Sequence, residues 1–109
     1  MSDTADDIKK YLAGEFGMDD AEIDEMLSMF SESLTRLLDD IEDCIASGDA
    51  GRLKDAGHTL KGVAANIGAE QIASLGKDIE EIGKTGQPEQ AAGQLAELKI
   101  ALDTLTQSN

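Results

Sequence analysis

Residues 53–68 read LKDAGHTLKGVAANIG, and the spacing of the apolar letters in this stretch predicts an α-helix. Apolar or small residues recur at steps of three and four, which places them on one helix face: Leu53, Gly57, Leu60, Ala64 and Ile67. His58, the only histidine in the chain, lies about 160° around that helix from Leu60. We therefore expect its imidazole ring in solvent.

The solvent-facing stripe of this helix combines the histidine with two ammonium groups and two residues that have almost no side chain. It consists of Lys54, His58, Lys61, Gly62 and Ala65. A glycine inside a helix costs about 1 kcal/mol relative to alanine, so helix stability does not explain Gly62. Because Gly62 lies one turn from His58 on the same face, its bare backbone leaves room for a partner to reach the imidazole. The glycines at 57, 76 and 93, in contrast, indicate close approach between helices.

Four further segments show the same helical period. The expected helices span about 3–16, 19–47, 49–67, 69–84 and 88–106. The longest has the clearest boundaries, since Asp19 and Glu22 resemble a capping box and Gly48 is typical of a C-terminal cap. Asp49 fits the N-cap of the next helix, and Pro88 fits the first turn of the last.

The expected inward stripes are mostly aliphatic. They are Ile8, Leu12 and Phe16; Ile23, Leu27, Phe30, Leu34, Leu37, Ile41 and Ile45; Ile72, Leu75, Ile79 and Ile82; and Ala91, Leu95, Leu98, Leu102 and Leu105. Aromatic residues make up only 3 % of the chain and tryptophan is absent, a composition typical of helical cores. Short connections make neighbouring helices antiparallel. We therefore expect an all-α fold, an antiparallel up-down-up-down four-helix bundle with a short additional N-terminal helix, forming a single domain over residues 1–109.

Charge and cysteine content narrow the expected partners. The net charge of −14 disfavours nucleic acid and anionic membrane surfaces. Residues 1–50 hold 15 acids and 3 bases, whereas residues 51–109 hold 8 acids and 6 bases, so His58 lies in the less acidic half.

No apolar run approaches the roughly 18 residues of a membrane span. Cys44 is the only cysteine and is expected in the core, which fits a reducing compartment, and we expect a cytoplasmic monomer.

Most catalytic constellations are missing from the sequence. It has no GxxxxGK[ST] loop, no HExxH motif, no CxxC pair and no second histidine. The acids of residues 39–43 lack the EF-hand pattern and fit a solvated face. We therefore expect neither a bound cofactor nor a metal ion in this chain.

One chemical role needs only a single exposed imidazole, namely nucleophilic attack on a phosphoryl group presented by another protein. Near neutral pH the imidazole is largely uncharged, so one ring nitrogen keeps a lone pair for attack. Lys61 and Lys54 lie one turn away on either side, and their ammonium groups can offset the negative charge of the phosphorylated histidine. The competing interpretation is an incidental surface histidine beside incidental lysines.

The residues around His58 also form a recognisable pattern. The segment from His58 to Ala69, HTLKGVAANIGA, continuing through Leu75 to Ile79 and Glu80, resembles the histidine phosphotransfer (HPt) domain family over some 25 residues. The matching positions are the His, Leu, Lys and Gly of HxLKG, followed by Asn66, Ile67 and Gly68. Two departures are Gly57 for the usual alanine and Ile79 for leucine, and we expect neither to touch the chemistry.

The resemblance implies that His58 is the phosphoacceptor and that Lys61 steadies the phosphoryl group. It implies that Glu80 accepts a hydrogen bond from the non-attacking ring nitrogen of His58, although a plain surface acid is an equal alternative. Lys54, Gly62 and Ala65 would then face the partner. The implied partners are response-regulator receiver domains and a histidine kinase or hybrid kinase. Mg²⁺ would be supplied by the receiver, and the chain would be a carrier rather than an enzyme.

Two other functions stay open at this point. The first alternative is a non-catalytic helical adaptor in which His58 is incidental, and the second is the phosphoacceptor domain of a chemotaxis-type histidine kinase.

Overall fold

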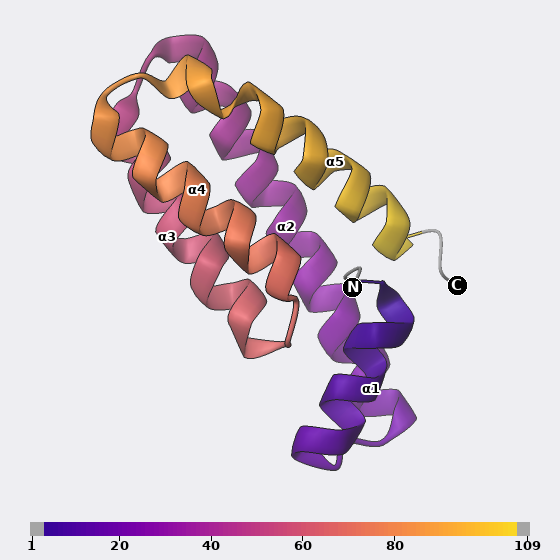
Figure 1. Ribbon diagram of the computed structural model, residues 1–109. Coiled ribbons are helices and arrows are strands. Elements are labelled where there is room, and N and C mark those ends of the chain that lie inside the picture. The colour runs from indigo at the N-terminus through magenta and orange to yellow at the C-terminus, as the bar shows by residue number, and fades with distance from the viewer. Residues whose placement is uncertain (1–3, 107–109) are drawn as a thin grey trace.

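The computed structural model describes residues 4–106, and within that range every regular element is a helix. There are five α-helices, with one short 3₁₀ turn before the last (Figure 1). They are α1 (Ala5–Phe16), α2 (Asp20–Ser47), α3 (Ala50–Asn66), α4 (Glu70–Thr85), η1 (Pro88–Ala91) and α5 (Ala92–Thr106). The start of the first helix expected near Asp3 lies outside the described residues.

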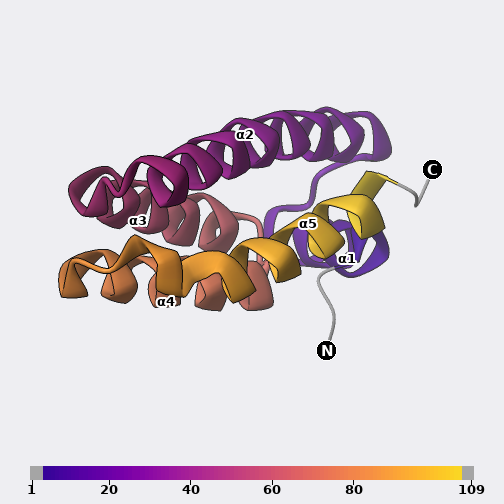
Figure 2. The same cartoon turned by 90° about the horizontal axis from the view of Figure 1, so that it is seen from above.

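Helices α2 to α5 alternate in direction along the chain, and α1 lies at one end beside α2 and α5 (Figure 1). Helices α3 and α4 share by far the most extensive contact, and α2 packs against both α3 and α5. Viewed from above, α2 lies on one side, α4 on the other, and α3 beside both (Figure 2). Helix α5 meets α4 mainly near the turn that joins them and then diverges, so the two enclose a groove.

The helix ends follow local capping chemistry. Asp19 and Glu22 form a reciprocal capping box at α2, and Asp49 caps α3 by accepting from the backbone of Arg52. Gly48 adopts the left-handed conformation that ends α2. The helix expected from residue 88 begins instead as a 3₁₀ turn, because the N–H of Gln90 bonds to the carbonyl of Gln87 three residues back.

Leucine and isoleucine side chains dominate the core. Those almost fully buried are Ile8, Leu12, Leu34, Ile41, Leu53, Leu60, Ile72, Ile79 and Leu98. Two expectations need correction. Phe16 is 60 % exposed, because it lies at the end of α1, where its ring makes a T-shaped contact with Tyr11. In α2, Leu38, which the expected stripe omits, is buried, while Leu37 and Ile45 are only half-buried against the core, since α3 and α5 cover α2 from two sides. Cys44 is buried, as expected.

Three glycines bring α3 and α4 into backbone contact. A Cβ atom on Gly57 would collide with the backbone nitrogen of Glu80, and one on Gly76 would lie 2.7 Å from the backbone nitrogen of Lys61. A Cβ on Gly83 would lie 2.5 Å from the backbone nitrogen of Lys54. Gly93 does not share this role, because nothing lies within 4 Å of its Cβ position; its expected part in close packing was wrong.

Candidate functional site

His58 projects from the middle of α3 into solvent. Its side chain is 68 % exposed, while Gly57 beside it and Leu60 two residues on are buried. The helical period explains this arrangement, because the apolar stripe turns toward α2 and α4 and leaves the opposite face open. The imidazole is therefore accessible from outside the protein.

The partner of this imidazole comes from the adjacent helix. Nδ1 of His58 lies 2.9 Å from Oε2 of Glu80, whose side chain is only 13 % exposed. The two residues are 22 positions apart in sequence. They meet because Gly57 allows the backbone of α4 at Glu80 to lie directly against α3. The expectation that Gly57 has no bearing on the site therefore needs correction, because its missing Cβ determines how close α4 lies to His58.

Glu80 also binds a second group on α3. Nζ of Lys61 lies 3.0 Å from Oε1 of Glu80, so the two carboxylate oxygens are divided between the lysine and the histidine. The hydrogen bond from Lys61 is the main cause that lowers the pKa of Glu80 below its ordinary value. Partial burial opposes this change, and the bond to His58 adds to it. Glu80 is therefore a carboxylate at neutral pH.

This charge state assigns the roles of the two ring nitrogens. An ionised carboxylate only accepts hydrogen bonds, so Nδ1 of His58 carries the proton and donates a hydrogen bond to Oε2 of Glu80. In the neutral ring the lone pair then belongs to Nε2. The nitrogen that keeps a free lone pair is thus the one that Glu80 does not bind.

The face around the imidazole is bare. Nothing lies within 4 Å of the Cβ position of Gly62, which distinguishes this glycine from those packed between α3 and α4. Ala65, one turn further on, is also exposed. Both positions therefore face solvent rather than a neighbouring helix.

The structure brings His58, Lys61 and Glu80 into hydrogen-bond contact. Two nearby lysines, Lys54 and Lys84, do not join these contacts within residues 4–106. Lys54 is exposed, and its backbone packs on Gly83. Lys84 forms an exposed pair with Glu81, at 3.4 Å. The Lys61–Glu80 pair was missed by the sequence analysis, because no local signal joins residues 19 positions apart. The glycine at 76, facing the backbone of Lys61, was the one available hint.

Within residues 4–106 no group of three or more His, Cys, Asp or Glu side chains is arranged to hold a metal ion. None of the helices over the same range combines the length and the apolar character needed to cross a membrane.

A helical protein that presents one imidazole on an open face, with its second nitrogen held by a carboxylate, is suited to carry a group on that imidazole. Comparison with protein families supports this class. The chain matches the Hpt domain over residues 25–108 and belongs to the Hpt domain family. Hpt domains act in histidine phosphotransfer within phosphorelays, where they carry phosphoryl groups between kinases and receiver domains. Neither the curated proteins nor the solved structures gave a match.

Proposed function

We propose that this protein accepts a phosphoryl group on Nε2 of His58 from the aspartyl phosphate of a response-regulator receiver domain and passes it to a second receiver. The observation that carries the proposal is the contact between Nδ1 of His58 and Glu80 beneath an exposed ring. The contact selects the tautomer needed for attack, and the open Gly62 face provides the approach. We further propose that α2 to α5 form an up-down-up-down four-helix bundle, supported by their alternating directions (Figure 1).

In the transfer step, the lone pair of Nε2 forms a P–N bond while the P–O bond to the receiver aspartate breaks, and the aspartate leaves as a carboxylate. The ring then carries positive charge, because Nδ1 keeps its proton. Glu80, already hydrogen-bonded to Nδ1, compensates that charge. The reverse sequence delivers the phosphoryl group to the next aspartate.

Lys61 is proposed to stabilise the phosphoryl group. Phosphorylation places close to two negative charges above α3, and the flexible ammonium of Lys61 lies one turn from the histidine. Its side chain is 38 % exposed, so it has room to reach outward while Glu80 is its resting partner. Lys54 and Ala65 complete the proposed contact face. The Mg²⁺ that neutralises the transferring group is proposed to come from the receiver.

The test is transfer from a radiolabelled phosphorylated receiver domain, with Mg²⁺ present, to the wild-type chain and to His58→Gln. The wild type should gain acid-labile, alkali-stable phosphate, and the variant should gain none. Because the His58 side chain is largely exposed, the variant should keep its fold, which circular dichroism checks. Labelling of His58→Gln equal to that of the wild type would refute the assignment.

Receiver binding and labelling by a kinase domain, measured beside this assay, separate the two rival functions. A non-catalytic adaptor would bind the receiver without gaining phosphate. The phosphoacceptor domain of a chemotaxis-type kinase would be labelled by an ATP-dependent kinase domain and not by a receiver.

A further inference from the structure

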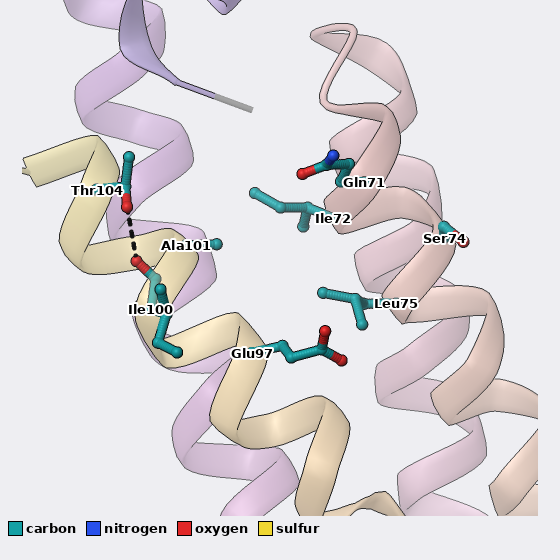
Figure 3. A pocket seen from close by; sticks show the side chains of 8 residues that line it. All are labelled: Gln71, Ile72, Ser74, Leu75, Glu97, Ile100, Ala101 and Thr104. Atoms are coloured by element: carbon teal, nitrogen blue, oxygen red, sulfur yellow. Dashed lines mark hydrogen bonds between the residues drawn. The ribbon is translucent and has the colours of Figure 1, made fainter. Parts of the chain in front are cut away.

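Helices α4 and α5 enclose an open groove of about 490 Å³ that takes no part in the site around His58. Figure 3 shows its walls, formed by the first turns of α4 and the middle of α5. Ile72 and Leu75 line one side and Ile100 and Ala101 the other. Ile100 is 66 % exposed, the highest value among the large hydrophobic residues of 4–106. The groove therefore leaves apolar surface in water.

The groove has one charged lining residue, Glu97, and the remaining lining side chains are uncharged. In Figure 3 the Glu97 side chain extends from α5 toward Leu75 on α4. No ion pair to Glu97 is found within residues 4–106, whereas Glu42 on α2 is paired with Lys99 of the same helix α5. The groove therefore presents one negative charge among uncharged side chains, and a cation of an occupant would complement that charge.

The shape of the groove fits a short helix. The lining residues of α5 run from Glu97 to Thr104, a length of about 12 Å, or roughly two helical turns. An amphipathic helix buries apolar side chains in such grooves at i, i+3, i+4 and i+7. A second copy of this chain is disfavoured as the occupant, because each copy carries a net charge of −14 and would bring acid against acid.

The groove and His58 lie on different flanks of α4. Gly76 and Glu80 face α3, whereas Leu75, on the groove, lies about 100° from Gly76 and about 140° from Glu80 around the helix. An occupant of the groove therefore leaves the imidazole accessible.

We propose that the α4–α5 groove is a second docking surface, which binds a basic amphipathic helix of a partner protein while His58 remains free. Apolar side chains of that helix cover Ile100 and Leu75, and a lysine or arginine pairs with Glu97. The inference does not rest on the proposed phosphoryl transfer, since no groove residue belongs to that site.

The probe is a synthetic helical peptide of about 14 residues with leucines along one face and lysines beside them. Titrated into the ¹⁵N-labelled full chain up to about 1 mM, it should shift the amide signals of residues 71–75 and 97–104. Ile100→Ala should weaken binding about tenfold and Glu97→Gln about two- to fivefold. Met29→Ala is the matched control, because Met29 is 57 % exposed on α2 and should leave the affinity unchanged.

Two further peptides separate shape from charge. A peptide with the leucines replaced by serine keeps its charge and should not bind, and one with the lysines replaced by glutamate should bind more weakly. Equal binding of the serine peptide, shifts outside the groove, or no shifts at all would overturn the proposal. Sedimentation gives a further check. If the wild type is a dimer and Ile100→Ala is a monomer, a second copy of the chain occupies the groove, and the proposal is overturned.

The groove and the phosphoryl site are tested independently. His58→Gln should bind the leucine–lysine peptide as the wild type does. If the wild type gains no phosphate but still binds this peptide in the groove, the proposed function fails and the groove proposal stands.

Discussion

The backbone of Glu80 lies too close to Gly57 to leave room for a Cβ atom there, so Gly57 sets the distance between the helix that carries His58 and the helix that carries its carboxylate. The contact links the packing of α3 and α4 directly to the chemistry of the imidazole. A change at a buried position without any functional group should therefore affect the site.

Gly57→Ala should destabilise the fold. Overpacking costs about 1–3 kcal/mol, and here the atoms met are backbone atoms of Gly76 and Glu80, which cannot rotate away. The better helix propensity of alanine returns about 1 kcal/mol. Urea unfolding should show a net loss. Gly93→Ala, where nothing lies within 4 Å, is the control and should be stabilising. A Gly57→Ala protein as stable as the wild type would show that α4 moves aside at little cost.

Glu80→Gln should slow phosphoryl transfer to His58 by about tenfold or more. The amide keeps the size of the side chain but loses the charge that fixes the proton on Nδ1 and compensates the phosphorylated ring. Nitrogen NMR of the imidazole should show a mixture of tautomers in the variant and one tautomer in the wild type. Glu81→Gln, which removes only the exposed pair with Lys84, should change neither the rate nor the tautomer.

Lys61→Met should raise the pKa of Glu80 toward its ordinary value, because the bond from Lys61 is the main cause that lowers it. Carbon NMR of the Glu80 carboxyl over an acid titration measures the change. If the pKa of Glu80 in the variant equals that in the wild type, the bond from Lys61 is not the main cause that lowers it. The variant should also lose its phosphohistidine faster, since the proposed counter-charge is gone.

The lowered pKa of Glu80 predicts a definite pH dependence of stability. A carboxyl whose pKa is lower in the folded state contributes stability that is complete above its unfolded pKa, about 4.3. That contribution is lost as the pH falls through the lowered folded value. The difference in free energy of unfolding between the wild type and Glu80→Gln should therefore shrink as the pH falls below about 4.3. A difference that grows toward low pH would contradict the assigned sign.

Gly62→Leu should leave the fold intact and impair transfer. Nothing lies within 4 Å of the Cβ position, so the larger side chain meets solvent in the free protein and an incoming receiver in the complex. Unfolding should show no loss of stability while the transfer rate falls. Gly93→Leu, exposed on α5, is the control. Normal transfer kinetics in Gly62→Leu would argue against the steric role.

Periodicity and capping chemistry, which are local properties, were enough to predict the helices and the exposure of His58. The step pattern from Leu53 to Ile67 selects the face that packs, and the caps at Asp19, Gly48 and Asp49 depend on neighbours a few residues away. The same local information failed at Phe16, whose spacing fits the stripe but whose place at the end of α1 leaves it exposed.

The sequence alone determined which helix presents the imidazole, and it determined that the surface of this helix carries no side chain at Gly62. Only the packing of α3 on α4 decided that Glu80 holds both Lys61 and His58, and that the glycines at 57 and 93 have different roles. The physical reason is that helical spacing determines which residues share a face, whereas a carboxylate shared by two partners depends on how close two backbones come.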